Sequence, residues 1–445
     1  MLPLRYGEPL AAQSSAPLES GACKSVRGAD AACAAHSMAI RPALVQDRTS
    51  RRYAGTSMNL RSVLLAWSLT MSVAATPAAA RDRATELLIG CYTGPQCRGI
   101  ARHRFDSVQG RIDPQPLEVI ETDNPSWLTF SADGRHLFAL NENGPASADP
   151  VGRASSYLLA RGNARSQRLS QANTLGDEPA HASASADGKY LFVANYAVAA
   201  APGGTLAVLP VDGEGRLQPA VQVMTHLASG ADPERQASTH VHAAVPTPDG
   251  RYLLAADLGA DKVYVYRYDP VRSVERPLRA AETPHLALPP GSGPRHLLFD
   301  ASGRRAYLSL EMSGEVVVLE RDEDRLRIVQ TLALDPGRRE GNAAAALHLS
   351  ADGRFLYASN RGADNHIAVY AVEAGSGRLS PLQRRSSEGR GPREFALTPD
   401  GRHLVVANQH SGSLVVIARD PDSGLLGATL QTLPAFAPSD VKFVP

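Results

Sequence analysis

Short runs of alternating hydrophobic and polar residues pass through most of the chain, and they come in pairs joined by a tight turn. In residues 125–141 the pair reads PSWLTF-SADG-RHLFALN. A period of two is typical of β-strands, and Asp-Gly between two such runs predicts a hairpin. A third alternating run follows, such as KVYVYRYD at 262–269, and then a short polar one. Each unit therefore predicts four antiparallel strands.

The turn phrase returns six times along the chain. The copies read SADGRHLFALNE, SADGKYLFVANY, TPDGRYLLAADL, DASGRRAYLSLE, SADGRFLYASNRG and TPDGRHLVVANQ, and their turn glycines are Gly134, Gly188, Gly250, Gly303, Gly353 and Gly401. Successive glycines lie 48 to 62 residues apart. A strand-rich repeat of this length is typical of propeller blades. WD40 repeats would need regular Trp-Asp pairs, and the chain has 2 tryptophans.

A seventh unit can be assembled from the two ends of the repeat region. Residues 86–94 (ELLIGCYTG) and 99–106 (GIARHRFD) supply strands, and PSDVKFVP at 438–445 echoes the PSWLTF of the first full copy. We expect the last strand to become the innermost strand of the first blade, which leaves no bare sheet edge at the closure. The predicted fold is all-β: a seven-bladed β-propeller over residues 81–445 with four-stranded antiparallel blades.

The chain before this region has a different pattern. Residues 58–80, MNLRSVLLAWSLTMSVAATPAAA, have the features of a signal peptide: Arg61 near the start, a short apolar stretch and a small-residue end. Residues 1–57 lack periodicity, and we interpret them as a gene-model extension or a disordered leader. A short membrane anchor, or a twin-arginine signal at residues 51–52, are the alternatives. A signal peptide predicts a periplasmic or secreted protein with no membrane segment after cleavage.

Composition narrows the class of partner. The chain has 46 Lys and Arg against 45 Asp and Glu, a net charge of +1, so we expect no nucleic acid partner. Cys91 and Cys97, in CYTGPQC, either form a disulfide or remain free thiols. Two sulfurs without clustered histidines argue against a zinc site, and we expect no metal or cofactor. The predicted protein is a monomer or weak oligomer that binds a small molecule.

Blade geometry converts sequence position into a candidate site. The start of the first strand and the end of the second lie on the same face of the ring. The residues eight positions before each turn glycine are Ser126, Ala180, His242, Arg295, Ala345 and Arg393. Three of these six are large and basic, which suits an anionic ligand. At the ends of the second strands, Asn141, Asn195, Asn360 and Asn408 recur and predict an architectural role, whereas Glu311 and Arg361 depart from that pattern.

Three segments carry a family resemblance. GPRHLLFDASGRRAYLSLEMSG, LHLSADGRFLYASNRG and GPREFALTPDGRHLVVANQHSG resemble the seven-bladed lactonase propellers. That family contains one type of 6-phosphogluconolactonase and is similar to fungal carboxy-muconate cyclases. By position, the resemblance implies the site residues His181, His242, Arg295, His296, Glu311, His348, Arg361, Arg393 and Gln409. The chain departs from the family at Ala346, two residues before His348, where members often carry an acidic residue.

The resemblance implies a metal-independent lactone hydrolase acting on a sugar or sugar-acid lactone. The expected catalytic residues are His242, Arg295, Glu311, His348 and Arg361, and the expected substrate-binding residues are His181, His296, Arg393 and Gln409. Glu311 or His242 would be the general base, and two arginines would stabilise the oxyanion. An exported enzyme would not meet a cytoplasmic phosphorylated substrate, so we expect an unphosphorylated lactone. The alternatives are a muconate-type lactone cycloisomerase and a non-catalytic binding propeller of the cell envelope.

Overall fold

The structure is a computed structural model that describes residues 85–445, apart from 198–202, 338–340 and 342. The predicted leader (1–57) and signal peptide (58–80) lie outside the described residues. Within the described part, no helix has the length and apolar character needed to cross a membrane.

Strands follow one another along the chain in groups of four, and each group forms one antiparallel sheet. The second to fourth sheets contain β5 (Pro125–Phe130), β6 (His136–Asn141), β7 (Arg153–Leu158) and β8 (Gln167–Asn173); β9 (Pro179–Ala184), β10 (Tyr190–Asn195), β11 (Thr205–Pro210) and β12 (Gln222–Thr225); and β13 (Val241–Pro246), β14 (Tyr252–Asp257), β15 (Lys262–Tyr268) and β16 (Leu278–Ala287). The fifth to seventh contain β17 (Pro294–Phe299), β18 (Arg305–Leu310), β19 (Glu315–Asp322) and β20 (Arg325–Ala333); β21 (Ala343–Leu349), β22 (Phe355–Arg361), β23 (His366–Val372) and β24 (Leu379–Ser386); and β25 (Pro392–Leu397), β26 (His403–Asn408), β27 (Ser413–Arg419) and β28 (Leu426–Pro434).

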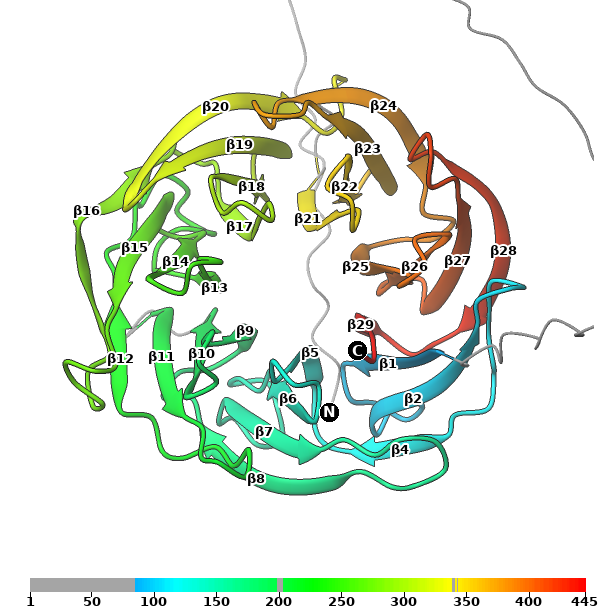
Figure 1. Cartoon of the computed structure of the whole chain (residues 1–445), viewed down its shortest axis with the longest axis horizontal. Helices are drawn as coiled ribbons and strands as arrows, with labels where there is room; N and C mark the ends of the chain where they lie inside the picture. The colour runs from blue at the N-terminus through cyan, green and yellow to red at the C-terminus, as the bar shows by residue number, and fades with distance from the viewer. Residues whose placement is uncertain (1–84, 198–202, 338–340, 342) are drawn as a thin grey trace, which may run out of the picture. The chain divides into compact units, whose positions relative to one another are not determined.

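The first sheet combines both ends of the described chain. It contains β1 (Thr85–Cys91), β2 (Gly99–Asp106), β3 (Arg111–Ile112), β4 (Glu118–Glu121) and β29 (Pro438–Phe443). β29 pairs antiparallel with β1, with Ile89 opposite Val441. The inner strands β5, β9, β13, β17, β21, β25 and β29 contact one another in a closed ring around the centre of the seven blades (Figure 1). The predicted seven-bladed propeller, closed by its terminal strands, is confirmed.

The repeated turn is stabilised by its own side chains. In the first copy the Ser131 hydroxyl accepts from the backbone N–H of His136 (2.9 Å), and Asp133 Oδ1 accepts from the N–H of Arg135 (3.1 Å). The glycine that follows the aspartate, Gly134, has φ +65°, a conformation that glycine adopts without steric cost. The recurring [Ser/Thr]-x-Asp-Gly phrase thus specifies one hairpin geometry in several blades.

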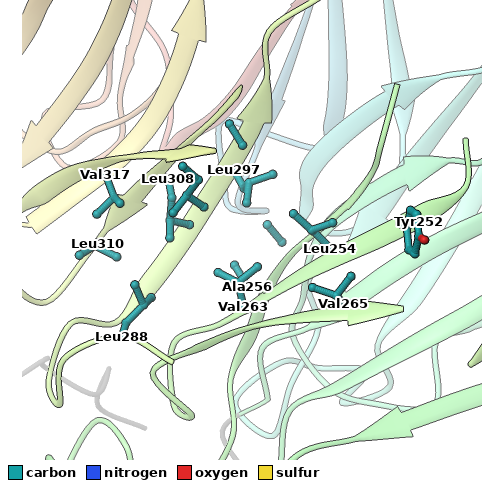
Figure 2. Packing of buried hydrophobic residues seen from close by; sticks show 13 residues of the cluster. Tyr252, Leu254, Ala256, Val263, Val265, Leu288, Leu297, Leu308, Leu310 and Val317 are labelled. Atoms are coloured by element: carbon teal, nitrogen blue, oxygen red, sulfur yellow. The ribbon is translucent and has the colours of Figure 1, made fainter. Parts of the chain in front are cut away.

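The core lies between the blades rather than inside any one of them. On β14, Leu254 and Ala256 face the next blade, whereas Leu253 and Ala255 face the previous one, and all four are buried. Figure 2 shows Leu254 packing in the same cluster as Leu308 from β18. Because a central strand has a neighbour on each face, both of its alternating sets are apolar, which explains unbroken runs such as YLLAA.

Two smaller predictions concern the face that carries the candidate site. The recurring asparagines bond to the loops that enter their own blades: Asn195 Nδ2 donates to the carbonyl of Thr174 (3.0 Å), Asn408 Nδ2 donates to that of Ser387 (2.9 Å), and Asn360 Oδ1 accepts from the N–H of Ala343 (3.1 Å). Their architectural role is confirmed. Cys91 and Cys97 are joined in a disulfide that closes the turn between β1 and β2.

Candidate active site

An irregularity at the start of the inner strands brings large polar side chains to one end of the channel. In β17, Pro294 pairs with Leu310 but Leu297 pairs with Leu308, so Arg295 and His296 together face a single residue of β18. Similar shifts occur near the starts of the other full blades' inner strands. A bulge of this kind re-aims side chains, and bulges are common beside active sites.

Glu311, which directly follows β18, lies among three guanidinium groups. Its Oε2 is 2.9 Å from Nε of Arg295 and 2.7 Å from Nη2 of Arg361, and its Oε1 is 2.8 Å from Nη2 of Arg235. Burial raises the pKa of the Glu311 carboxyl, but the arginines, led by Arg361 and Arg295, hold the pKa well below its usual range. Glu311 is therefore a permanently ionised anchor for cations, which makes it a poor proton acceptor.

The most deeply buried of these cations is Arg295. Its side chain is 2% exposed, and burial together with nearby Arg361 lowers its pKa to about 9. The group therefore stays protonated at neutral pH. Nη1 of Arg295 also contacts Nε2 of His296 (3.0 Å), and since a guanidinium has no acceptor, this imidazole nitrogen accepts. The remaining proton of neutral His296 is then on Nδ1.

Three neutral histidines line the channel next to this cluster. The ring centroid of His296 lies 5.4 Å from that of His242 and 5.8 Å from that of His181, which packs 4.3 Å from Trp127. Burial lowers the pKa of His181 to about 3 and holds the pKa values of His242 and His296 well below the usual range. Two buried atoms here have no hydrogen-bond partner in the described part of the chain: Nδ1 of His242 and Nε of Arg361.

A second ionic group lies deeper in the channel. Glu394 Oε1 is 2.6 Å from Nε2 of His348, and its Oε2 is 3.8 Å from Nδ1 of His296. Burial raises the pKa of Glu394, but Lys442 and His348 outweigh that effect and lower it to about 2. Lys442 lies over the ring of Trp127 (4.3 Å). These side chains border a cavity of about 380 Å³.

The opposite wall of the mouth is acidic. Nη2 of Arg393 lies 3.3 Å from Oε2 of Glu142, and the hydroxyl of Tyr92 donates to Oε1 of the same carboxylate (2.7 Å). The Arg393 guanidinium also lies 5.3 Å from the centre of the Tyr92 ring. Glu178 interacts electrostatically with both Glu142 and Arg393. Burial, followed by repulsion from Glu142 and Asp177, raises the pKa of Glu178 to about 7.

Comparison with known proteins decides what this arrangement belongs to. The family described as Lactonase, 7-bladed beta-propeller matches residues 86–443. The 6-phosphogluconolactonase of Bacillus subtilis is 31% identical over 360 residues, which cover 80% of this chain and 97% of that relative. The chain belongs to the seven-bladed β-propeller lactonase family. This membership confirms two predictions from the sequence: the family, and the activity class of a lactone hydrolase.

Solved lactonase structures agree with this placement. The periplasmic gluconolactonase of Pseudomonas aeruginosa superposes with a TM-score of 0.78 at 53% identity, covering 81% of this chain and 99% of its own. A putative 6-phosphogluconolactonase of Bacteroides fragilis superposes with a TM-score of 0.75 at 32% identity, covering 83% of this chain and 100% of its own. One neighbour is thus named for an unphosphorylated sugar lactone and the other for a phosphorylated one.

This lactonase brings most of the sequence-predicted site residues together. Direct contacts or short ring distances link His181, His242, Arg295, His296, Glu311 and Arg361, and Glu394 joins His348 to them. Arg393 lies within electrostatic range of Glu311. Gln409 follows β26 at the same end, half-buried, with its backbone N–H donating to the carbonyl of Gly391 (2.9 Å). Ala346 is buried in the core, and the carboxylate beside His348 comes from Glu394 in the next blade.

Several residues of the lactonase site were not found from the sequence. The residues two positions after the leading proline of an inner strand form a layer across the channel: Trp127, His181, His296, Glu394 and Asp440. This register would have revealed Glu394, which directly follows the predicted Arg393. Arg235 carries no such signal, because it lies in the loop between β12 and β13 outside the repeated phrase. Glu142 and Tyr92 follow the second strand of their blades; blade geometry alone predicts Glu142 at the mouth, without giving it a role, whereas Tyr92 was missed.

Proposed function

We propose that the chain hydrolyses the lactone of a sugar acid at the channel mouth around Glu311. The observation that carries this proposal is the pairing of charge-stabilising and proton-accepting groups there. Arg295 and Arg361 are held charged against one carboxylate, while His242 beside them is neutral and has a free Nδ1. Lactone hydrolysis needs both, because negative charge develops on the carbonyl oxygen while a water loses a proton.

We assign the general base to His242 rather than to Glu311. Both carboxylate oxygens of Glu311 already accept from guanidiniums at 2.7 to 2.9 Å, whereas Nδ1 of the neutral His242 imidazole has no hydrogen-bond partner in the described part of the chain and can accept a proton from water. The water oxygen then bonds to the ring carbonyl carbon, and Arg295 and Arg361 stabilise the resulting oxyanion. When the tetrahedral intermediate collapses, the ring C–O bond breaks and the imidazolium of His242 returns the proton to the leaving alkoxide. Atoms and charges balance, giving the open hydroxy acid.

We assign the other predicted residues to orienting the catalytic groups and to holding the substrate. His296 accepts from Arg295 and so fixes the orientation of that guanidinium. We assign His348 to the support of Glu394 and, as first expected, to a second route for protonating the alkoxide. His181, Arg393 and Gln409 are assigned to holding the rest of the substrate. For location, the predicted signal peptide and the periplasmic relative together support export to the periplasm.

Turnover of gluconolactone by the purified protein tests the proposal. Hydrolysis is followed by acid release at constant pH, with the spontaneous rate subtracted. His242→Gln should lower kcat/KM by about 100-fold or more, the usual scale of general base catalysis. The exposed His285→Gln, on β16 at the outside of its blade, is the matched control and should leave kcat/KM unchanged. Activity should survive incubation with a chelator, as a metal-independent reaction requires.

The pH profile provides a second readout for the same assignment. Because burial holds the pKa of His242 well below its usual range, the imidazole stays unprotonated as pH falls through 6.5. The base is therefore retained in mild acid, and kcat/KM should not fall by half near pH 6.5. Equal activity of His242→Gln and the native protein would overturn the assignment. Absence of hydrolysis together with ring closure of a muconate, seen as loss of diene absorbance, would instead favour the cycloisomerase.

A further inference from the structure

We propose that Glu142 and Glu178 form an acidic wall at the channel mouth that selects an uncharged, hydroxyl-bearing lactone and rejects a phosphorylated one. This inference rests on the proposed lactonase reaction at the same site. It adds two residues that the expected catalytic and substrate-binding residues do not include, and it gives them the role of specificity determinants.

The carboxylate of Glu142 is held in place by residues from two other blades, the first and the seventh. Tyr92, after β1, donates its hydroxyl to Oε1 (2.7 Å), and Arg393, from β25, approaches both carboxylate oxygens (3.4 and 3.3 Å). The side chain of Glu142 is 11% exposed. From its position in the sequence, Arg393 is expected to bind an anionic group of the substrate. In the structure its guanidinium is already paired with the carboxylate of Glu142.

Glu178 is brought beside Glu142 by an unusual backbone. The residue has φ +48°, which costs free energy for a side chain other than glycine. Its N–H donates to the carbonyl of Asn143 (2.7 Å), next to Glu142, and its own carbonyl accepts from the N–H of Tyr196 (2.9 Å). A Cβ on Gly144 would lie 2.8 Å from Cγ of Glu178, so a glycine at this position makes room for the side chain. Backbone bonds and packing thus hold the two carboxylates near each other.

The charges around Glu178 come from every neighbouring element. Glu142, Asp177 and Arg393 face it, and the phenols of Tyr92 and Tyr196 lie within its electrostatic range. Burial and the two neighbouring carboxyls raise the pKa of Glu178 to about 7. The wall therefore gains negative charge as pH rises through neutrality, and below that range Glu178 can donate a hydrogen bond.

The four guanidiniums described at the mouth all have carboxylate partners within the chain. Arg235, Arg295 and Arg361 meet Glu311, and Arg393 meets Glu142. A phosphate dianion reaching Arg393 would have to displace Glu142 and lie beside Glu178, and like charges placed together oppose binding strongly. A sugar hydroxyl has the opposite preference, because it can donate to either carboxylate. The mouth is thus built to hold hydroxyls at one wall and the ester group at the other.

The test compares two substrates across a small variant set. kcat/KM is measured for gluconolactone and for 6-phosphogluconolactone with the native protein, Glu142→Gln, Glu178→Gln and the double variant. The native protein should prefer the unphosphorylated lactone, and the double variant should lower that preference by about 10-fold or more, mainly through a lower KM for the phosphorylated substrate. Glu320→Gln, which removes a carboxylate from β19 on the periphery, is the control and should change neither value.

The pH dependence separates specificity from a structural role. The preference for the unphosphorylated lactone should rise between pH 6 and pH 8 more steeply in the native protein than in Glu178→Gln, where the second ionisation of the substrate phosphate, with a pKa of about 6, still contributes. A double variant that hydrolyses both lactones with the native preference would overturn the wall while leaving the lactonase intact. If the native protein hydrolyses neither, the proposed function fails, and calorimetric titration with gluconate and 6-phosphogluconate decides the wall separately. Tighter binding of the phosphorylated acid by the native protein would overturn it.

Discussion

At the scale of single residues, the mouth is governed by how a buried carboxylate and several buried guanidiniums compensate one another. Removing water from each charge costs several kcal/mol, and good geometry between the partners is what offsets that cost. Glu311 meets Arg235, Arg295 and Arg361 at 2.7 to 2.9 Å, so the three cations depend on one anion. The same anion orients the two arginines that we assign to the oxyanion, which ties stability and catalysis to one side chain.

Replacement of Glu311 by glutamine should therefore be costly. Glu311→Gln leaves three guanidiniums without their counter-charge, and we expect the free energy of unfolding to fall by about 3–5 kcal/mol. The matched control is Glu320→Gln: Glu320 pairs with Arg305 and Arg327 in a more exposed setting, where water screens the charges, so its replacement should lower the free energy of unfolding far less. Urea denaturation followed by tryptophan fluorescence measures both. Equal losses in the two variants would show that the Glu311 cluster contributes no more than a surface pair.

At the scale of the elements, the hairpin turn and the inner-strand bulge have different roles in a blade: the turn stabilises it, and the bulge positions side chains in the channel. The turn phrase is local: its hydroxyl, carboxylate and glycine satisfy their own backbone, as in Ser131 to Gly134. The bulge at the other end of the inner strand interrupts the pairing and aims side chains into the channel, as with Arg295 and His296. The turn end of each hairpin therefore has a sequence that stabilises the fold, whereas the end with the bulge can vary and supply functional side chains.

The turn glycines make a clear prediction about backbone conformation. Gly353 has φ +70°, and a Cβ placed there would meet nothing within 4 Å. Gly353→Ala therefore isolates the cost of a left-handed conformation, and we expect a loss of about 1 kcal/mol in stability. Gly213, in the loop after β11, has the same open surroundings without a positive φ, so Gly213→Ala should be neutral or slightly stabilising. A smaller loss at Gly353 than at Gly213 would contradict this account.

How far the sequence could predict the structure also depends on the element. Strand alternation and the Asp-Gly turn act over a few residues, so the blades and their number could be read directly. Register then located Arg295, Glu311, Arg361 and Arg393, because equivalent positions in different blades meet at one channel mouth. Their partners could not be derived this way: Glu142 meets Arg393 across 251 residues, and Arg235 comes from a loop with no repeat. Which side chains pair across the mouth depends on their lengths and on the distances between blades in the folded ring, and a repeat pattern does not contain those distances.

At the scale of the whole propeller, the site depends on ring closure. The mouth draws on all seven blades, so a change in the curvature of the ring would separate residues such as Arg393 and Glu142 even if every blade kept its own fold. β29 completes the first blade from the C-terminal end of the chain, and it contacts both neighbouring inner strands, β25 and β5. It also carries Lys442 and Asp440, which are paired at 2.9 Å in the channel.

Removal of β29 should therefore prevent the ring from forming. A protein ending at Ala437 would leave β1 with an unpaired edge and would expose Leu87 and Ile89, which pack against Val441. We expect most of this protein to aggregate, because an open apolar edge strand recruits other chains. Deleting Pro445 alone keeps β29 and serves as the control, with solubility and melting temperature close to those of the native protein. Sedimentation and circular dichroism distinguish the outcomes. A soluble, monomeric protein with native melting would show that six blades and an unfinished first sheet close without the C-terminal strand, and the channel mouth would then need another source of rigidity.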